Sequence, residues 1–178
     1  MNRRPDLPEY PARYGRYVDL VPENDICAAM EQQLDTTIAC VSRIPESKVD
    51  WRYAPGKWTT REVVGHVLDT ERIFGFRLLT FGRGDAVTLQ RADEELYVRN
   101  AEFNRYPIAA WADEFAQVRR SHVTLVRHLP ASAWDRIGTL SIGPISVRAM
   151  AYVMVGHERH HLRIIRDKYL FDANRTDS

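Results

Sequence analysis

The chain of 178 residues has the length of one compact domain, and its 44% hydrophobic and 28% charged residues exclude a disordered or fibrous protein. Twenty-five Lys and Arg against 24 Asp and Glu leave a net charge of +1, which disfavours binding of nucleic acid by charge. No window approaches the roughly 18 apolar residues of a membrane span, and no secretory leader is recognisable, so we expect a cytoplasmic protein with neither a nucleic-acid nor a membrane partner.

Residues 1–22 carry four of the nine prolines, with three tyrosines between them. These are Pro5, Pro8, Pro11 and Pro22, with Tyr10, Tyr14 and Tyr17. Because proline has a fixed φ and no backbone N–H, we expect an extended N-terminal arm that lies on the body of the protein, with regular structure beginning after it.

The first helix follows the arm. Apolar residues recur every three to four positions from Ile26 onward, which predicts a helix with Asn24 as its N-cap that ends before Pro45. The two cysteines, Cys27 and Cys40, lack C-x-x-C spacing and would lie about 220° apart around this helix, so no disulfide is expected.

A second helix begins after the turn at 55–58. Thr59 and Glu62 match a capping box, in which each side chain accepts a hydrogen bond from a backbone N–H that the helix leaves free. Apolar residues then supply one face of the helix until the loop at 82–85, whose two glycines end it.

Residues 86–106 are predicted to form a long polar loop with one short helical turn near Asp93. Pro107 suits the first turn of a third helix, which continues with helical spacing up to Pro130. Residues 132–137 are predicted to form one more turn, and residues 138–144 to form a tight reversal rather than a core strand.

The last long helix is predicted from about Ser146 to Tyr169, with apolar residues on one face and arginines on the other. The apolar residues are Val147, Met150, Met154, Ile164 and Ile165, and the arginines are Arg159, Arg163 and Arg166. Four helices of roughly 20 residues, joined without convincing strands, most economically bury their apolar faces as an all-α four-helix bundle. We assign the bundle to residues 23–170 and a C-terminal tail to residues 171–178.

The six histidines include a cluster in the last helix that is the most informative feature of the sequence. Side chains four residues apart, such as those of His157 and His161, differ by about 40° around a helix and can close on one ion. Both point toward the apolar face, so we predict that this pair binds a metal. His160 is predicted to lie at the seam or surface of the bundle, beside Asp167.

A third ligand has to come from elsewhere in the chain. His66 is the best candidate because it lies at the margin of the apolar face of the second helix, where two helices would meet, while Asp167, Asp172 and Asp177 stay open as alternatives. Three histidines would leave one coordination position free, which is typical of a catalytic site, and imidazole suits zinc, nickel, copper or iron(II).

The remaining histidines have simpler interpretations. His122 lies on the apolar face of the third helix and is predicted to be a hydrogen-bonded core residue. His128 is predicted to be a cation that interacts favourably with the C-terminus of that helix.

Residues 157–161 also match the H-E-x-x-H motif of zinc proteases, in which Glu158 would be the general base. These proteases need further ligands downstream and a sheet edge that holds the peptide, and Glu158 would point sideways, about 100° from His157. A zinc protease is therefore a minor alternative.

Three segments, residues 56–59, 65–69 and 156–161, resemble the DinB/YfiT-like superfamily. That family has a tryptophan at the head of the second helix, one histidine within this helix and an H-x-x-x-H motif on the last helix. The matching positions here are Trp58, His66, His157 and His161. The resemblance implies a four-helix bundle, commonly a homodimer, whose three histidines hold a divalent metal such as zinc, nickel or iron.

The resemblance also implies a function. Members with known activity are S-transferases or isomerases that use low-molecular-weight thiols, and others are classed as metal-dependent hydrolases. We therefore predict an enzyme whose metal activates a thiol, or else water, toward a small-molecule substrate. A non-catalytic metal-binding or helical interaction module is the alternative.

Residues that could line the pocket are harder to place from the sequence. The candidates are Trp58, Thr59, Thr70, Arg77 and Met154. Arg77 is the only candidate for a catalytic role, and as a cation in line with His66 it suggests an anionic group on the substrate.

Overall fold

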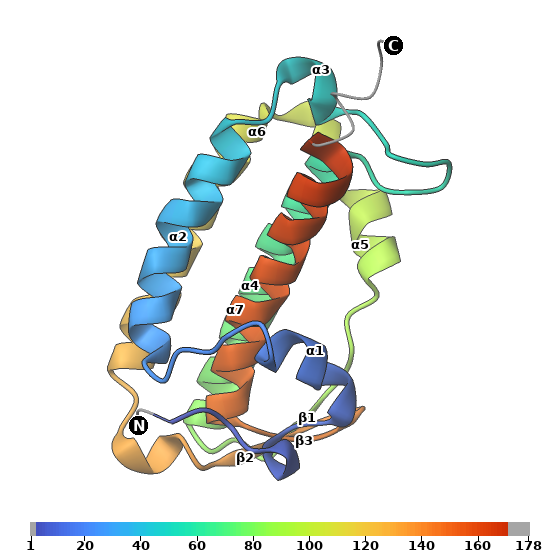
Figure 1. The fold of residues 1–178 in the computed structure, drawn as a ribbon. Helices are drawn as coiled ribbons and strands as arrows, with labels where there is room; N and C mark the ends of the chain where they lie inside the picture. Colours follow the sequence, from blue (N-terminus) through green and yellow to red (C-terminus); the bar gives the residue numbers. More distant parts are fainter. Residues whose placement is uncertain (1–2, 171–178) are drawn as a thin grey trace.

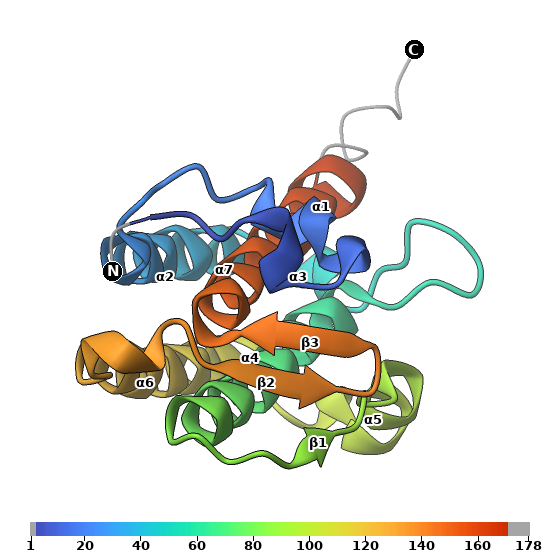
Figure 2. The ribbon, with the colours of Figure 1, turned by 90° about the horizontal axis from the view of Figure 1, so that it is seen from below.

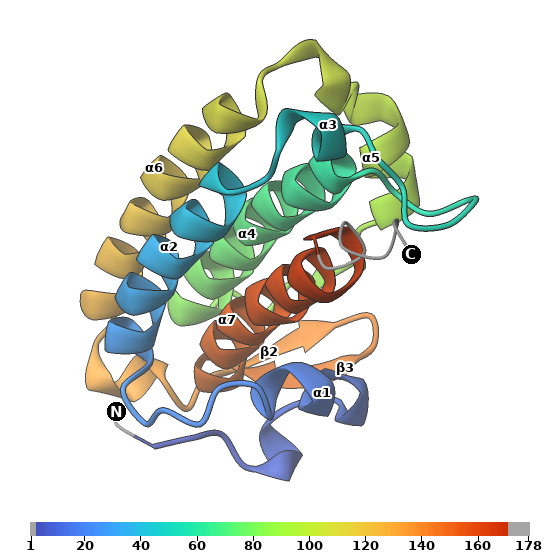
Figure 3. The same ribbon diagram turned by 45° about the horizontal axis from the view of Figure 1, so that its top comes forward.

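The computed structural model describes residues 3–170 and contains a bundle of four long helices. The helices are α2 (Ile26–Ser42), α4 (Thr60–Gly82), α6 (Ile108–Arg127) and α7 (Val147–Ile164). They lie side by side in Figures 1 and 3, so the predicted fold class is confirmed. The predicted tail at 171–178, with Asp172 and Asp177, lies outside the described residues.

Side-chain caps define where three of these helices begin. Thr59 and Glu62 form the predicted capping box at the start of α4, and Ser146 accepts a hydrogen bond from the backbone N–H of Ala149 in α7. The cap of α2 is Asp25 rather than the predicted Asn24, because its carboxylate accepts from the backbone N–H of Ala28 at 3.1 Å.

α7 lies at the centre of the fold rather than along one side of the bundle. Every residue from 147 to 158 is buried. The predicted division of this helix into a buried apolar face and an exposed face therefore does not hold in its first part. Arg159, predicted for the solvent side, is half-buried and pairs with Glu23 at 2.8 Å. The other side of α7 is covered by the N-terminal arm and by a small sheet.

The small sheet has three strands, which the sequence analysis did not predict. They are β1 (Thr88–Leu89), β2 (Ile137–Leu140) and β3 (Gly143–Ser146), in the order β1-β2-β3. β2 and β3 form an antiparallel hairpin, and β1 runs parallel to β2. Figure 2 shows the sheet closing the end of the bundle where α7 begins.

Tertiary packing explains why most of the segment predicted as a reversal, residues 138–144, forms the two strands β2 and β3. A Cβ at Gly138 would lie 2.1 Å from the ring of Phe81, so only glycine lets this strand approach α4. Leu140 and Ile145 then bury their side chains against the bundle. Glycine and proline in this segment indicate a turn when the sequence is taken alone. The strands form because they pack against α4, which is distant in the chain.

The N-terminal arm lies on the body as expected, but it is not extended. It contains η1 (Leu7–Glu9), η2 (Ala12–Tyr14) and α1 (Gly15–Val18). Tyr17 and Val18 are buried against α7. A Cβ at Gly156 of α7 would lie 2.0 Å from the carbonyl oxygen of Tyr17, so this contact requires glycine.

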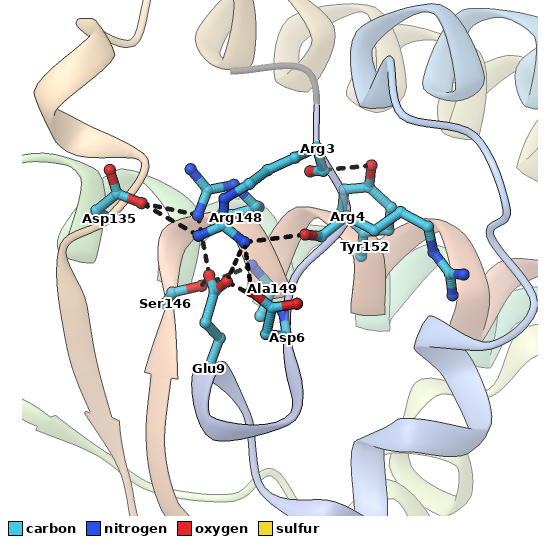
Figure 4. Close-up of polar contacts among 9 residues, drawn as sticks. All are labelled: Arg3, Arg4, Asp6, Glu9, Asp135, Ser146, Arg148, Ala149 and Tyr152. Carbon is cyan, nitrogen blue, oxygen red and sulfur yellow. Dashed lines mark hydrogen bonds and ion pairs between the residues drawn. The ribbon is translucent and has the colours of Figure 1, made fainter.

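Polar contacts with the start of α7 anchor the arm (Figure 4). Glu9 accepts hydrogen bonds from Ser146 Oγ at 2.7 Å and from Arg148 at 3.0 Å, and Arg148 also pairs with Asp135 at 2.8 Å. The hydroxyl of Tyr152 donates to the carbonyl of Glu23 at 2.7 Å. The arm is therefore held at both its beginning and its end.

Shorter elements complete the described part of the chain. They are α3 (Glu46–Val49), α5 (Glu94–Ala101), η3 (Phe103–Arg105), η4 (Ala131–Ala133) and η5 (Ile165–Leu170). α5 is the helical turn predicted near Asp93, and η4 overlaps the turn predicted at 132–137. Cys27 and Cys40 are free. Among residues 3–170, no helix combines the length and apolar character needed to cross a membrane.

Candidate metal centre

Three histidines from two helices converge inside the bundle. His66 comes from α4, and His157 and His161 come from successive turns of α7. One ring nitrogen from each histidine lies within 4.8 Å of the other two, and the Nε2 atoms of His66 and His157 are 3.2 Å apart. The structure thus brings together the three residues that the sequence predicted as metal ligands.

Aromatic side chains surround the three imidazoles. Trp58, at the head of α4, has its ring 4.8 Å from that of His66. Phe74 and Tyr17 present their rings to His157 at 5.5 and 5.3 Å. These rings cover part of the surface of the imidazoles.

Burial keeps the three imidazoles uncharged. It lowers the pKa of His66 to about 4, and it lowers the pKa values of His157 and His161 well below their ordinary value. Repulsion between the clustered rings adds to the effect for His157 and His161. At neutral pH each ring therefore keeps a lone pair, which is the form that binds metals.

The residues present fit a divalent metal. Nδ1 of His161 is buried without a hydrogen-bond partner, and within residues 3–170 no carboxylate bonds to any of the three rings. Buried polar atoms normally have partners, so such a cluster of lone pairs is costly unless a cation accepts them. Three neutral nitrogens suit zinc, nickel or iron(II).

A cavity of about 220 Å³ opens in front of the histidines and borders all three. Trp58, Thr70 and Arg77 line it, as predicted for pocket residues. Thr59 and Met154 do not line it, because Thr59 caps α4 and Met154 is buried in the core.

His160 lies closer to this cavity than predicted. It lines the cavity wall, and its ring centroid is 5.6 Å from that of Tyr17 on the arm. Asp167, its predicted neighbour, instead pairs with Arg163 and Arg166 at 3.3 and 3.1 Å. His160 thus lies at a seam, but the arm rather than Asp167 is its neighbour there.

Glu158 faces away from the cavity, which argues against the zinc protease. It accepts hydrogen bonds from Thr37 and, at 2.7 Å, from Arg119 in the bundle core. Arg119 also holds Glu71 through two contacts of 2.8 Å. A carboxylate committed to this cluster cannot act as the base that H-E-x-x-H proteases require.

Sequence reasoning missed the buried charge cluster formed by Glu71, Arg119 and Glu158. The available signal was spacing, because Arg119 lies four residues from both Phe115 and Val123 and so shares their buried face. Burial raises the pKa of Glu158 to about 7, whereas Arg119 outweighs the same effect at Glu71 and lowers its pKa to about 2.

The other two histidines lie at the places in α6 that the sequence predicts for them. Nδ1 of His122 lies 2.9 Å from Glu71, so this ring is a hydrogen-bonded residue at the edge of the core. His128 is the exposed C-cap of α6, and its Nδ1 lies 2.8 Å from the carbonyl of Thr124. Both rings have partners of their own and stand outside the group of three.

Comparisons with known proteins agree with this architecture. The family model of the DinB superfamily matches residues 29–165. YfiT from Bacillus subtilis, described as a "probable metal-dependent hydrolase with an unusual four-helix bundle topology", is 17% identical with a TM-score of 0.77, over 84% of this chain and 87% of that one. A DinB-like protein of Bacillus subtilis, YjoA, is also 17% identical, with a TM-score of 0.58 over 85% of this chain and 94% of its own.

A comparison with curated proteins found no match. At 17% identity the two structural relatives share the fold with this chain, while the family match covers most of the bundle, including all three clustered histidines. The chain therefore belongs to the DinB superfamily.

Proposed function

We propose that this protein is a metal-dependent enzyme whose ligands are His66, His157 and His161 and whose substrate is a small molecule. The observation that carries the proposal is the convergence of three neutral imidazoles, one with an orphaned buried nitrogen, on the wall of a 220 Å³ cavity. A divalent metal with a free coordination position supplies a Lewis acid that lowers the pKa of a thiol or a water molecule.

The residues around the site have separate roles in this proposal. The three imidazoles hold the metal, and the rings of Trp58 and Phe74 restrict water around it. Arg77, at the far side of Phe74, contacts the substrate rather than the metal, because its guanidinium cannot donate a lone pair.

Transfer of a low-molecular-weight thiol is the first candidate reaction. The two carboxylates that line the cavity lie beside arginines, Asp69 beside Arg72 at 3.4 Å and Glu94 beside Arg91 at 2.5 Å, and burial raises the pKa of Asp69. A thiol is far more acidic than water, so a carboxylate such as Asp69 would accept its proton more readily, which favours a thiol as the nucleophile.

Hydrolysis is the second candidate. The description of YfiT as a probable metal-dependent hydrolase supports it, and so does His160, an imidazole on the cavity wall that could accept a proton from water. A panel of cellular thiols with electrophilic acceptors, run beside ester and amide substrates, separates the two reactions. A thiol-dependent rate supports transfer, and a thiol-independent rate supports hydrolysis.

Metal analysis tests the site itself. The purified chain is equilibrated with zinc, nickel or iron(II) and desalted beside the His66→Ala/His157→Ala/His161→Ala variant, with His128→Ala as the matched control. We expect about one equivalent of metal in the wild type and the control and none in the triple variant. Equal metal in all three proteins would refute the site.

A protein that binds metal but turns over none of these substrates would favour the non-catalytic alternative. The absorption spectrum of the cobalt(II)-substituted protein separates the two, because added thiol changes the spectrum only if the metal has a coordination position that a thiol can occupy. The homodimeric state, the thiol partner and the cytoplasmic location stay predictions.

A further inference from the structure

We propose that the cavity contains a binding subsite for an oxyanion group of the substrate, centred on the guanidinium group of Arg77 on α4, with Arg13 and Arg16 of the N-terminal arm as further cations that line the same cavity. This inference rests on the proposed function, since it concerns the same cavity. It adds the class of substrate: a small molecule with a carboxylate or a phosphate at the end that lies away from the metal.

Arg77 is a buried cation without an anionic partner. It is 5% exposed, it lines the cavity, and its hydrogen bond goes to the neutral carbonyl of Gln90 at 3.0 Å. Within residues 3–170, no carboxylate lies within 4.0 Å of it. A buried charge is costly unless it is paired, so this arrangement favours an anion that enters from outside.

Comparison with the other buried arginines strengthens this point. Arg119 pairs with two glutamates, Arg148 pairs with Glu9 and Asp135, and Arg61 pairs with Asp50. Of the four arginines that are buried in the described part of the chain, only Arg77 has a cavity where the others have a carboxylate.

The arm supplies two more cations to the same cavity. Arg13 and Arg16 both line it, and neither has a carboxylate partner among the described residues. Arg16 donates to the hydroxyl of Tyr17 at 2.8 Å, which holds its guanidinium near the cavity. Arg91 also lines the cavity, but it is neutralised by Glu94 at 2.5 Å and is not part of the subsite.

Arg77 and the three histidines lie at different places in the cavity, because Arg77 lies eleven residues beyond His66 on α4, about 16 Å along the helix axis. Arg16 lies nearer the histidines, since it contacts the ring of Tyr17, which packs against His157. An anion held by Arg77 therefore leaves the metal position free for the reacting group. Guanidinium binds carboxylate and phosphate oxygens in pairs, which orients the substrate along the cavity.

The test measures binding of simple anions by calorimetry, with the full chain in chelator-treated and zinc-loaded forms. The probes are malonate and inorganic phosphate, and malonamide is the neutral match for malonate. We expect malonate or phosphate to bind both forms with similar affinity, and malonamide to bind neither. The tighter of the two anions identifies the oxyanion that the subsite prefers.

Variants locate the binding. Arg77→Gln is expected to weaken anion binding at least tenfold and the Arg13→Gln/Arg16→Gln double variant at least threefold, while Arg120→Gln, on the exposed face of α6, changes nothing. Because Arg13 and Arg16 are exposed, their double variant tests the subsite even if Arg77→Gln does not fold. Unchanged affinity in the arginine variants that fold would overturn the proposal.

The same experiment separates this inference from the proposed function. Anion binding that occurs only in the zinc-loaded protein, or that is lost in the His66→Ala/His157→Ala/His161→Ala variant, would mean that the anion sits on the metal and would overturn the subsite. A chain that binds no metal but still binds malonate through Arg77 would refute the proposed function and support the subsite.

Discussion

Glu71 shows at the level of one residue how the bundle stabilises a buried charge. Burial alone would raise the pKa of Glu71, but the charge and hydrogen bonds of Arg119 outweigh it and lower the pKa to about 2, from an ordinary value of 4.5. The folded state therefore binds this proton more weakly than the unfolded state does. The stability from this pair, about 3 kcal/mol, is complete above pH 4.5 and is lost as the pH falls toward 2.

Glu71→Gln is expected to lower the free energy of unfolding at pH 7 by about 3–5 kcal/mol, because it leaves a buried arginine partly unpaired. The difference from the wild type should shrink as the pH falls from 4.5 toward 2, where Glu71 itself becomes protonated. Urea denaturation followed by circular dichroism at several pH values measures both effects.

The matched control for this experiment is Glu31→Gln, because Glu31 pairs with Arg127 on the surface. An exposed pair of this kind contributes less than about 1 kcal/mol, so the control should stay close to the wild type. A difference between Glu71→Gln and the wild type that does not change between pH 4.5 and 2 would contradict the assignment.

Single residues also mark the limit of prediction from sequence. The histidine pair on α7 was predictable because i,i+4 spacing is local, and Thr59 with Glu62 was predictable because a capping box spans one turn. The burial of Arg119 and the position of His160 depend on which helix or arm covers them. Such contacts join residues that are distant in sequence.

At the level of elements, the contact between α1 and α7 places part of the arm on the wall of the cavity. Tyr17 crosses α7 at Gly156, where a Cβ would meet its carbonyl oxygen at 2.0 Å. His157 directly follows Gly156, so the same contact positions the arm and one of the proposed metal ligands.

Gly156→Ala is therefore expected to displace the arm while α7 stays helical. Alanine favours a helix by about 1 kcal/mol over glycine, but the added methyl group forces the arm away at a cost of about 1–3 kcal/mol. Limited trypsin digestion should cleave after Arg13 or Arg16 faster than in the wild type. Gln117→Ala, on the exposed face of α6, should digest like the wild type, and an unchanged rate in Gly156→Ala would contradict the contact.

The small sheet is the element that the sequence did not predict. β2 and β3 are four residues each and contain Gly138 and Pro144, which are signals for a turn rather than a strand. They pair because Phe81 packs against Gly138 and because Leu140 and Ile145 reach the core. A strand that depends on tertiary packing carries little local signal.

For the whole molecule, the proposed metal site predicts that metal binding and folding are linked. An ion present at 100 times its dissociation constant stabilises the folded state by about 2.7 kcal/mol, which raises the Tm of a protein of this size by roughly 5–10 °C. We expect a chelator to lower the Tm of the wild type and of His128→Ala by this amount. His66→Ala should show no shift, and a chelator effect of equal size in His66→Ala would argue against the three-histidine site.

The predicted homodimer can be tested on the same protein. Phe76 and Leu79 lie one turn apart on α4 and are 58% and 43% exposed, which is unusual for large apolar side chains on neighbouring positions. Sedimentation should show a dimer, and Phe76→Glu should shift it toward monomer. A wild-type chain that sediments only as a monomer would reject the prediction.

The four-helix architecture followed from the sequence because each long helix carries its own periodicity, cap and terminator. What the sequence did not provide was the packing around the first part of α7, where residues 147–158 are all buried. Helix periodicity shows which face is apolar, but a helix covered by an arm and a sheet has no solvent face to detect.

The family match begins at residue 29, whereas Arg13 and Arg16 lie in the arm before it. The proposed subsite thus takes Arg77 from the part of the chain that the family model matches and its other two cations from the arm before it. If the proposed subsite is correct, a change in the arm would alter part of the substrate contacts while the helices that carry the histidines stay intact. Exchange of the N-terminal arm between two members of the family would then change the substrate preference and leave the three histidines in place.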